Sequence, residues 1–295
     1  MYDPIFLKYH LSNEHPESPD RVKYIYKELI NNNFDNVILN FEKKNDLTTW
    51  VKQIHSNEHI RLIEQNYPLP HKVAFSAVNA ALSGLDKIFD KKVESIFCPV
   101  RPPGHHALNT GREEGFCYYN TIAIAAKYAQ IKYKIKKILI IDWDYHHGNS
   151  TEHMFYSDPN ILFFSTHDLY AYPGTGDPKK IGEGKGKGLN VNIHLPCGTS
   201  DELILKTYKE ILVPKVEAFM PELILISAGF DSRINDTLGC FEITDNGFIE
   251  LTKLVMMMAE KFCNKRILSI LEGGYNVKGN AKATIAHIKA LNRLV

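Results

Sequence analysis

Two acidic residues and a histidine form the first chemical pattern in the chain. Asp144 and His146 are two residues apart, and residues at this spacing in an extended segment point to the same side. They can therefore share one metal ion, and Asp231 is a candidate third ligand. Three protein ligands leave a fourth position open for water, which is typical of catalytic zinc. An isolated Asp-x-His is more often a hydrogen-bonded pair at a strand end, but the clusters described below favour the metal site.

A second pattern offers proton transfer and charge stabilisation. His105 and His106 follow a stiff Pro-Pro-Gly turn, and an imidazole with an ordinary pKa of about 6.5 suits general acid–base catalysis. Tyr275 follows two glycines, whose backbone freedom allows its phenol to reach a developing oxyanion. Taken alone, the histidines would be interpreted as surface loop residues and the phenol as a core or rim tyrosine.

The order of these residues along the chain places them at one edge of a predicted sheet. Each polar cluster follows a short β-rich apolar run, typical of a strand buried on both faces of a parallel sheet. The runs are residues 95–100, 138–141, 161–164, 223–226 and 267–271, and the clusters are residues 101–106, 142–147, 165–168, 227–231 and 272–275. Because the carboxyl ends of such strands form a ligand crevice, we expect the clusters to converge on one active site.

Segments with helical character alternate with these runs. Helices are predicted at residues 73–89, 120–131, 201–219 and 245–262, with N-cap residues at 199–201 and 244–245. The alternation predicts an α/β fold, and the absence of repeats and linkers predicts a single domain over residues 1–295. The glycine-rich segment 182–188 does not join a strand to a helix, so we interpret it as a surface turn before a strand near 189–195.

The composition excludes several classes of protein. Hydrophobic residues make up 44% of the chain and the net charge is +1, so no global electrostatic attraction to nucleic acid or membrane is expected. Neither a signal peptide nor a membrane span is expected. Five cysteines, an odd number without a C-x-x-C pair, argue against a disulfide framework and a cysteine zinc site. A reducing cytoplasm is the predicted location.

With these motifs the chain resembles the histone deacetylase superfamily, which includes bacterial histone-deacetylase-like amidohydrolases, acetoin-utilisation proteins and acetylpolyamine amidohydrolases. The segments that carry the resemblance are HPESPDR (15–21), RPPGHHA (101–107), GFCYYN (115–120), IDWDYHHGN (141–149), YPGTG (172–176), SAGFD (227–231) and EGGYN (272–276). HHGN and SAGFD are closer to the class II branch than to class I. The resemblance implies an arginase-like fold with a central eight-stranded parallel sheet flanked by helices.

The resemblance also implies a role for each site residue. The implied zinc ligands are Asp144, His146 and Asp231, and the implied catalytic residues are His105, His106, Tyr275, Asp142 and Asn149. Asp142 would orient His105, and Asn149 would orient His106. Class I members usually carry aspartate at the position of Asn149, and the neutral amide would leave His106 less basic.

Further residues match the substrate and cation sites of the family. The implied substrate-binding residues are Gly115, Phe116, Tyr172, Leu238 and Gly274. A structural potassium ion is implied at Asp142, Asp144, His146, Ser165 and Thr166, and a second monovalent site at Phe155, Asp158 and Ile161. Arg21 matches a residue beside the cavity through which acetate is thought to leave.

Two departures from the family pattern concern the substrate. Residues 64–71 are interpreted as a trimmed loop without the acidic residue that often grips the substrate backbone. Leu238 stands where polyamine-selective members can place an acid, which favours acyl-lysine over polyamine.

The predicted function is zinc-dependent hydrolysis of the amide of N-acetyl-lysine in proteins or peptides, yielding lysine and acetate. Deacetylation of acetylpolyamines or other small acetylated amines is the alternative, and a non-catalytic acetyl-lysine binder is a third hypothesis. The sequence leaves open the physiological substrate, the acyl-chain preference, the oligomeric state and iron in place of zinc.

Overall fold

A parallel sheet forms the centre of the protein, in a computed structural model that describes residues 1–12, 14–34, 37 and 41–295. Its strands are β1 (Ser95–Cys98), β2 (Ile138–Asp142), β3 (Ile161–His167), β4 (Asn190–His194), β5 (Leu223–Ala228) and β6 (Ile267–Leu271). Their order across the sheet is β1-β6-β5-β2-β3-β4, and every neighbouring pair is parallel. All residues of β2, β3, β5 and β6 are buried, which confirms the prediction of strands covered on both faces.

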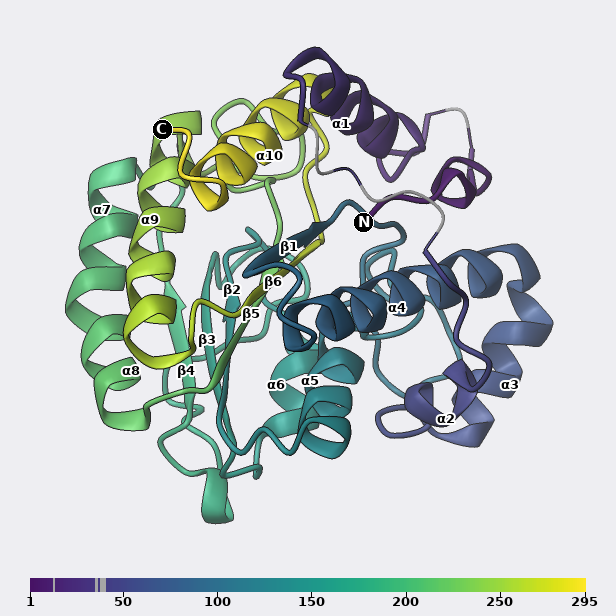
Figure 1. The fold of residues 1–295 in the computed structure, drawn as a ribbon, viewed down its shortest axis with the longest axis horizontal. Coiled ribbons are helices and arrows are strands. Elements are labelled where there is room, and N and C mark those ends of the chain that lie inside the picture. The colour runs from purple at the N-terminus through teal and green to yellow at the C-terminus, as the bar shows by residue number, and fades with distance from the viewer. Residues whose placement is uncertain (13, 35–36, 38–40) are drawn as a thin grey trace.

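Helices cover both faces of the sheet (Figure 1). The α-helices are α1 (Asp20–Asn31), α2 (Leu47–Val51), α3 (Asn57–Asn66), α4 (Pro68–Phe89), α5 (Thr121–Lys132), α6 (Asn149–Phe155), α7 (Asp201–Thr207), α8 (Val213–Phe219), α9 (Asp245–Phe262) and α10 (Val277–Leu291). Helices α7, α8 and α9 lie on one side, and α4, α5 and α6 lie on the other. Helix α10 packs against α9 and α1. The three layers confirm the predicted α/β class.

The predicted eight strands are wrong for the described part of the chain, where the sheet has six. Between β5 and α9 the chain forms no strand, because residues 232–243 make only an isolated bridge between Arg233 and Ile243. Beyond β4 the chain turns at Pro196–Thr199 and enters α7. A single bridge lacks the repeated backbone hydrogen bonds that define a ladder.

Two predicted segments differ locally from the structure. The helix predicted over 201–219 is divided into α7, a π-helical turn (Tyr208–Leu212) and α8. Pro214 has no N–H to donate to the carbonyl four residues before it, and this favours a shifted turn. Residues 64–71 form no loop: α3 ends at Asn66 and α4 begins at Pro68, a position that proline tolerates well.

The predicted surface turn at 182–188 contains a short 3-10 helix (Gly184–Gly186) and leads into β4. Helix α9 begins as predicted, because the Thr244 side chain accepts a hydrogen bond from the Gly247 N–H.

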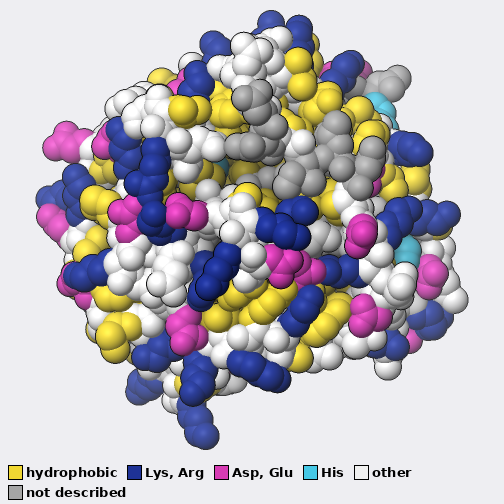
Figure 2. Space-filling model, in the orientation of Figure 1, with side chains coloured by type: hydrophobic (Ala, Val, Ile, Leu, Met, Phe, Trp, Pro, Cys, Tyr) yellow, Lys and Arg dark blue, Asp and Glu magenta, His cyan; other side chains and the backbone are white. Residues whose placement is uncertain are grey.

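Charged side chains of both signs are interspersed over the face seen in Figure 2. This face therefore presents no field of a single sign, in keeping with the low net charge. Among the described residues, no helix combines the length and the apolarity that crossing a bilayer requires.

Candidate active site

The sheet order opens a crevice between the loops that follow β2 and β5. These strands are neighbours, but the chain continues from β2 to β3 and β4 on one side and from β5 to β6 on the other. The connections therefore diverge at the carboxyl ends of β2 and β5, and ligands bind at such a switch point in open α/β sheets. Asp144 and His146 follow β2, and Asp231 follows β5.

The three predicted metal ligands meet in this crevice. One ligand atom from each of Asp144, His146 and Asp231 lies within 4.8 Å of the other two. His146 Nδ1 lies 2.9 Å from Asp231 Oδ2 and 3.2 Å from Asp144 Oδ1. Gly273 packs directly on these carboxylates, since a Cβ at this position would lie 2.1 Å from Asp231 Oδ2. Only glycine fits there, which explains one residue of the EGG sequence.

The charges of this cluster fit a cation. Asp144 and Asp231 are both buried, and two buried carboxylates repel each other unless a positive charge lies between them. Burial, and then the charge of Asp144, raise the pKa of Asp231 to about 7. Burial opposes the charge of His146, but its hydrogen bonds to both carboxylates raise its pKa to about 10. A divalent ion would replace the proton that holds this set together.

The paired histidines lie beside the cluster, each with the partner predicted for it. His105 Nδ1 is 3.0 Å from Asp142 Oδ2, and His106 Nδ1 is 2.8 Å from Asn149 Oδ1. The two imidazole centroids are 3.9 Å apart. His105 Nε2 lies 3.8 Å from Asp144 Oδ2, so both rings border the crevice.

Different neighbours give the two histidines opposite protonation states. Burial opposes a charge on His105, but Asp144, Asp142 and Glu272 raise its pKa well above the ordinary value. Burial and the charge of His105 lower the pKa of His106 well below it. These shifts favour a neutral His106, which can accept a proton, and a cationic His105. Two neighbouring groups whose pKa values are shifted in opposite directions are candidates for the acid and the base of a site.

Tyr275 is held by Arg21 and by Asp236, a residue that the sequence patterns did not single out. Its backbone N–H donates to Asp236 Oδ2 at 2.7 Å, and the Leu238 N–H donates to Asp236 Oδ1 at 2.9 Å. The guanidinium of Arg21 lies over the Tyr275 ring, 4.8 Å from its centroid. Asp236-x-x-Gly239 is a turn pattern in which an aspartate bonds the backbone two residues on, and this signal was present in the sequence.

Three of the predicted substrate-binding residues, Gly115, Phe116 and Tyr172, contact His106 or Tyr275 and would line a channel for the substrate. The Tyr172 ring lies 5.0 Å from the His106 ring, and the Phe116 ring lies 5.8 Å from the Tyr275 ring. Gly115 has a φ of +54°, and a Cβ there would lie 2.5 Å from the His106 ring and 2.7 Å from the Tyr172 ring. Glycine is therefore required by both the backbone conformation and the space.

The other predicted substrate residues lie next to Tyr275. Leu238 is 41% exposed on the turn that Asp236 organises. The Gly274 carbonyl accepts a hydrogen bond from Arg21 Nε at 2.7 Å. Arg21 also donates to Glu17 at 3.2 Å and to the Glu272 carbonyl, so this buried guanidinium supports the loop that carries Tyr275.

The predicted monovalent cation residues flank β2 and β3. Asp142 lies opposite Ser165 in the strand register, and Thr166 follows Ser165 in β3. For the second site, Phe155 ends α6 and Ile161 begins β3, with Asp158 between them.

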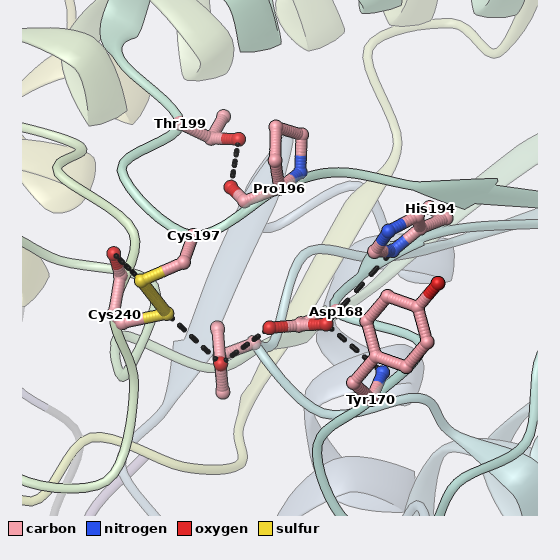
Figure 3. Close-up of a disulfide and its surroundings, with 8 residues drawn as sticks. Asp168, Tyr170, His194, Pro196, Cys197, Thr199 and Cys240 are labelled. Carbon is pink, nitrogen blue, oxygen red and sulfur yellow. Dashed lines mark hydrogen bonds and ion pairs between the residues drawn. A yellow bond between two sulfur atoms is a disulfide. The ribbon is translucent and has the colours of Figure 1, made fainter.

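The cysteine count, which argued against a disulfide framework, did not predict the single bond that joins Cys197 and Cys240 (Figure 3). Their Cα atoms are 5.1 Å apart although 43 residues separate them in sequence. An odd number of cysteines excludes only that all of them are paired in disulfides. Cys197 follows β4 and Cys240 follows β5, and the loops after these two strands bring the cysteines together. The Tyr145 hydroxyl lies 3.1 Å from Cys240 Sγ and donates to Asp168 Oδ2 at 2.8 Å.

We expect three of the five cysteines to react with a thiol reagent when the protein is denatured without reductant, and all five to react after reduction. The three are Cys98, Cys117 and Cys263, which are free and buried. In Cys197→Ser without reductant, all four remaining thiols should react. Five reactive thiols in the unreduced wild type would contradict the bond and would favour the predicted reducing location.

Comparisons with known proteins agree with this geometry. The Histone deacetylase domain family matches residues 15–291. A "Probable deacetylase" of Archaeoglobus fulgidus is 37% identical over 93% of this chain and 80% of its own length. "Histone deacetylase 5" of Arabidopsis thaliana is 32% identical over 99% of this chain, which spans 48% of that relative. The crystal structure of the "HDA15 HD domain" superposes with a TM-score of 0.90, 31% identity and coverage of 99% of this chain and 90% of that chain.

The family match, together with this site, identifies the chain as a hydrolase that acts on amides. The chain belongs to the histone deacetylase family, and the family match covers most of its length.

Proposed function

We propose that this protein is a zinc-dependent deacetylase of N-acetyl-lysine in proteins or peptides. The observation that carries the proposal is the meeting of Asp144, His146 and Asp231 beside His106, whose ring lies 6.2 Å from that of His146 and is hydrogen-bonded to Asn149. The ligand set of two carboxylates and one imidazole suits zinc with an open position. The aromatic rings of Phe116 and Tyr172 suit the apolar four-carbon stem of a lysine side chain.

Each residue of the site has a separate role in the proposed reaction. One divalent ion held by the three ligands would polarise the acetyl carbonyl and make the attacking water more acidic. His106 removes a proton from that water, and His105 supplies positive charge beside it. The water oxygen bonds to the acetyl carbonyl carbon, and Tyr275 donates its O–H to the oxyanion that the carbonyl oxygen becomes. His106 then gives its proton to the amide nitrogen as the C–N bond breaks, which releases the amine and acetic acid and restores the neutral imidazole.

Potassium belongs to the same proposal. The oxygen atoms of Asp142, Ser165 and Thr166 lie at the ends of adjacent strands, and a hard monovalent cation prefers oxygen ligands. Its charge would offset the buried carboxylate of Asp142, whose pKa is raised by burial.

The metal prediction is tested on the purified protein. We expect about one zinc per chain by elemental analysis, and its removal by a chelator should abolish hydrolysis of an acetyl-lysine peptide until zinc is restored. In Asp231→Asn the zinc content should fall while the circular dichroism spectrum stays that of the wild type. Full-length folded protein without any stoichiometric metal would instead favour a non-catalytic acetyl-lysine binder, and iron in its place would correct the cofactor.

The substrate class is tested by comparing kcat/KM for an acetyl-lysine peptide with that for acetylspermidine. We expect the peptide to be preferred, because the exposed Leu238 offers no charge to a second ammonium group. Leu238→Glu should raise the ratio of acetylspermidine to peptide turnover about fivefold, the effect of one exposed ion pair of up to about 1 kcal/mol. Leu238→Gln is the matched uncharged control, and a wild-type preference for acetylspermidine would support the polyamine alternative.

A further inference from the structure

The buried carboxylate of Glu272 joins the two loops that carry the catalytic side chains. Glu272 directly follows β6, and its Oε2 accepts the N–H of Gly104 at 2.6 Å and the N–H of His105 at 3.2 Å. Gly104 and His105 follow β1, which pairs with β6 in parallel. The two loops therefore leave the sheet side by side. Glu272 lies in the loop after β6, three residues before Tyr275, and it bonds the loop after β1, which carries His105 and His106.

The surroundings of Glu272 leave it little freedom. The side chain is fully buried, so its charge must be matched by donors, and bonds from backbone N–H groups to a carboxylate are among the stronger hydrogen bonds in proteins. Its second oxygen lies 3.4 Å from Ser227 Oγ. On the other side of the same loop, Arg21 donates to the carbonyls of Glu272 and Gly274.

The side-chain hydrogen bonds of Glu272 are with the backbone of Gly104 and His105 and with Ser227, and not with the metal ligands. None of its hydrogen bonds involves Asp144, His146 or Asp231, so the metal cluster does not account for its position. A carboxylate in this position fixes residues 104–106 relative to 272–275, and hence the His106 imidazole relative to the Tyr275 phenol. A misplacement of about 1 Å between reacting groups can cost about 100-fold in rate.

We propose that Glu272 is a positioning residue, whose acceptor oxygen on the Gly104 and His105 N–H groups aligns His106 and Tyr275 on the same substrate carbonyl. This inference rests on the proposed deacetylase function. It predicts a loss in kcat rather than in KM, because substrate binding in the channel does not involve Glu272.

Three substitutions separate the acceptor from the charge. Glu272→Leu has similar volume but leaves two buried N–H groups without a partner, and we expect kcat to fall about 100-fold with KM within about threefold. Glu272→Gln keeps an acceptor oxygen without the charge, and we expect it to restore kcat to within about fivefold of the wild type. Thr252→Val removes a buried hydroxyl that bonds His287 in another part of the core and should leave kcat unchanged.

Zinc content and melting temperature are measured for each variant, so that a loss of metal or of folding is distinguished from misalignment. A folded, zinc-loaded Glu272→Leu with wild-type kcat would overturn the proposal, whether or not its KM is raised. If the glutamine variant is as slow as the leucine variant, the charge of Glu272 and not its acceptor oxygen is what catalysis needs, and the positioning role is wrong. If the leucine variant does not fold, Glu272→Asp withdraws the carboxylate by one methylene and should lose about tenfold in kcat; wild-type turnover there would also contradict positioning.

A readout without turnover keeps this inference separate from the proposed function. If the wild-type protein hydrolyses neither substrate class, the proposed function fails. The ring ¹⁵N resonances of His106 in the zinc-loaded protein would still shift in Glu272→Leu and stay close to wild type in Glu272→Gln. Unchanged resonances in the leucine variant would overturn the positioning role by themselves.

Discussion

Tyr275→Phe is expected to lower kcat for the acetyl-lysine peptide about 10²- to 10³-fold, the usual effect of removing one oxyanion donor. The phenol is almost fully buried, and burial raises its pKa well above the ordinary value. It therefore keeps its proton and acts as a donor throughout the working pH range. Because the donor acts on charge that develops in the transition state, KM should change by less than about threefold.

The matched control for this substitution is Tyr119→Phe. Tyr119 is also buried, but its hydroxyl bonds His71 at 2.9 Å, and kcat should stay within about twofold of the wild type. Single-turnover kinetics on zinc-loaded protein measures the chemical step directly. Wild-type turnover of Tyr275→Phe together with His106→Ala would show that the catalytic assignment is incorrect.

Acidification from pH 7.5 to pH 5 is expected to favour unfolding by about 2 kcal/mol for each of three buried histidines. Burial lowers the pKa of His55, His167 and His287 to about 3 in each case. These histidines stay neutral in the folded protein at pH 5, whereas in the unfolded chain they bind protons below about pH 6.5. Each favours the unfolded state by about 2 kcal/mol at pH 5, so stability falls as pH drops from about 6.5 towards 3.

Urea denaturation at the two pH values, with zinc held constant, measures this difference. In His287→Gln the difference should shrink by about 2 kcal/mol, because one of the three buried imidazoles is gone. His153→Gln is the control, since His153 is exposed and should leave the difference unchanged. An unaltered pH dependence in His287→Gln would show that this imidazole is not responsible.

The strands and the convergence of the site were predictable because both depend on short-range patterns. A run such as Ile138–Asp142 is apolar at every position except its last, which is distinctive for a strand covered on both faces. Since parallel strands end at one edge, the residues after them must lie together, and the crevice brings Asp144 and Asp231 into one cluster.

The remaining features depend on contacts that no local pattern encodes. Cys197 and Cys240 meet only because two loops at the same edge of the sheet approach each other, so a cysteine count could not pair them. The support of Tyr275 by Asp236 and of His105 by Glu272 likewise joins loops from different strands. The eight-stranded sheet was carried over from the family as a whole, and strand number at a sheet edge varies with short segments that a resemblance does not resolve.

The origin of the metal ligands on β2 and β5 has a consequence for how the molecule is assembled. His146 and Asp231 are 85 residues apart in sequence, and the intervening chain forms β3, β4, α7 and α8. A chain emerging from the ribosome therefore carries two ligands long before the third, and contacts across such a separation form slowly. An ion that needs all three would bind only after β5 has docked on β2, and at 100 times its dissociation constant it would add about 2.7 kcal/mol to the completed fold. Metal binding would then stabilise only those chains whose central strands have already paired.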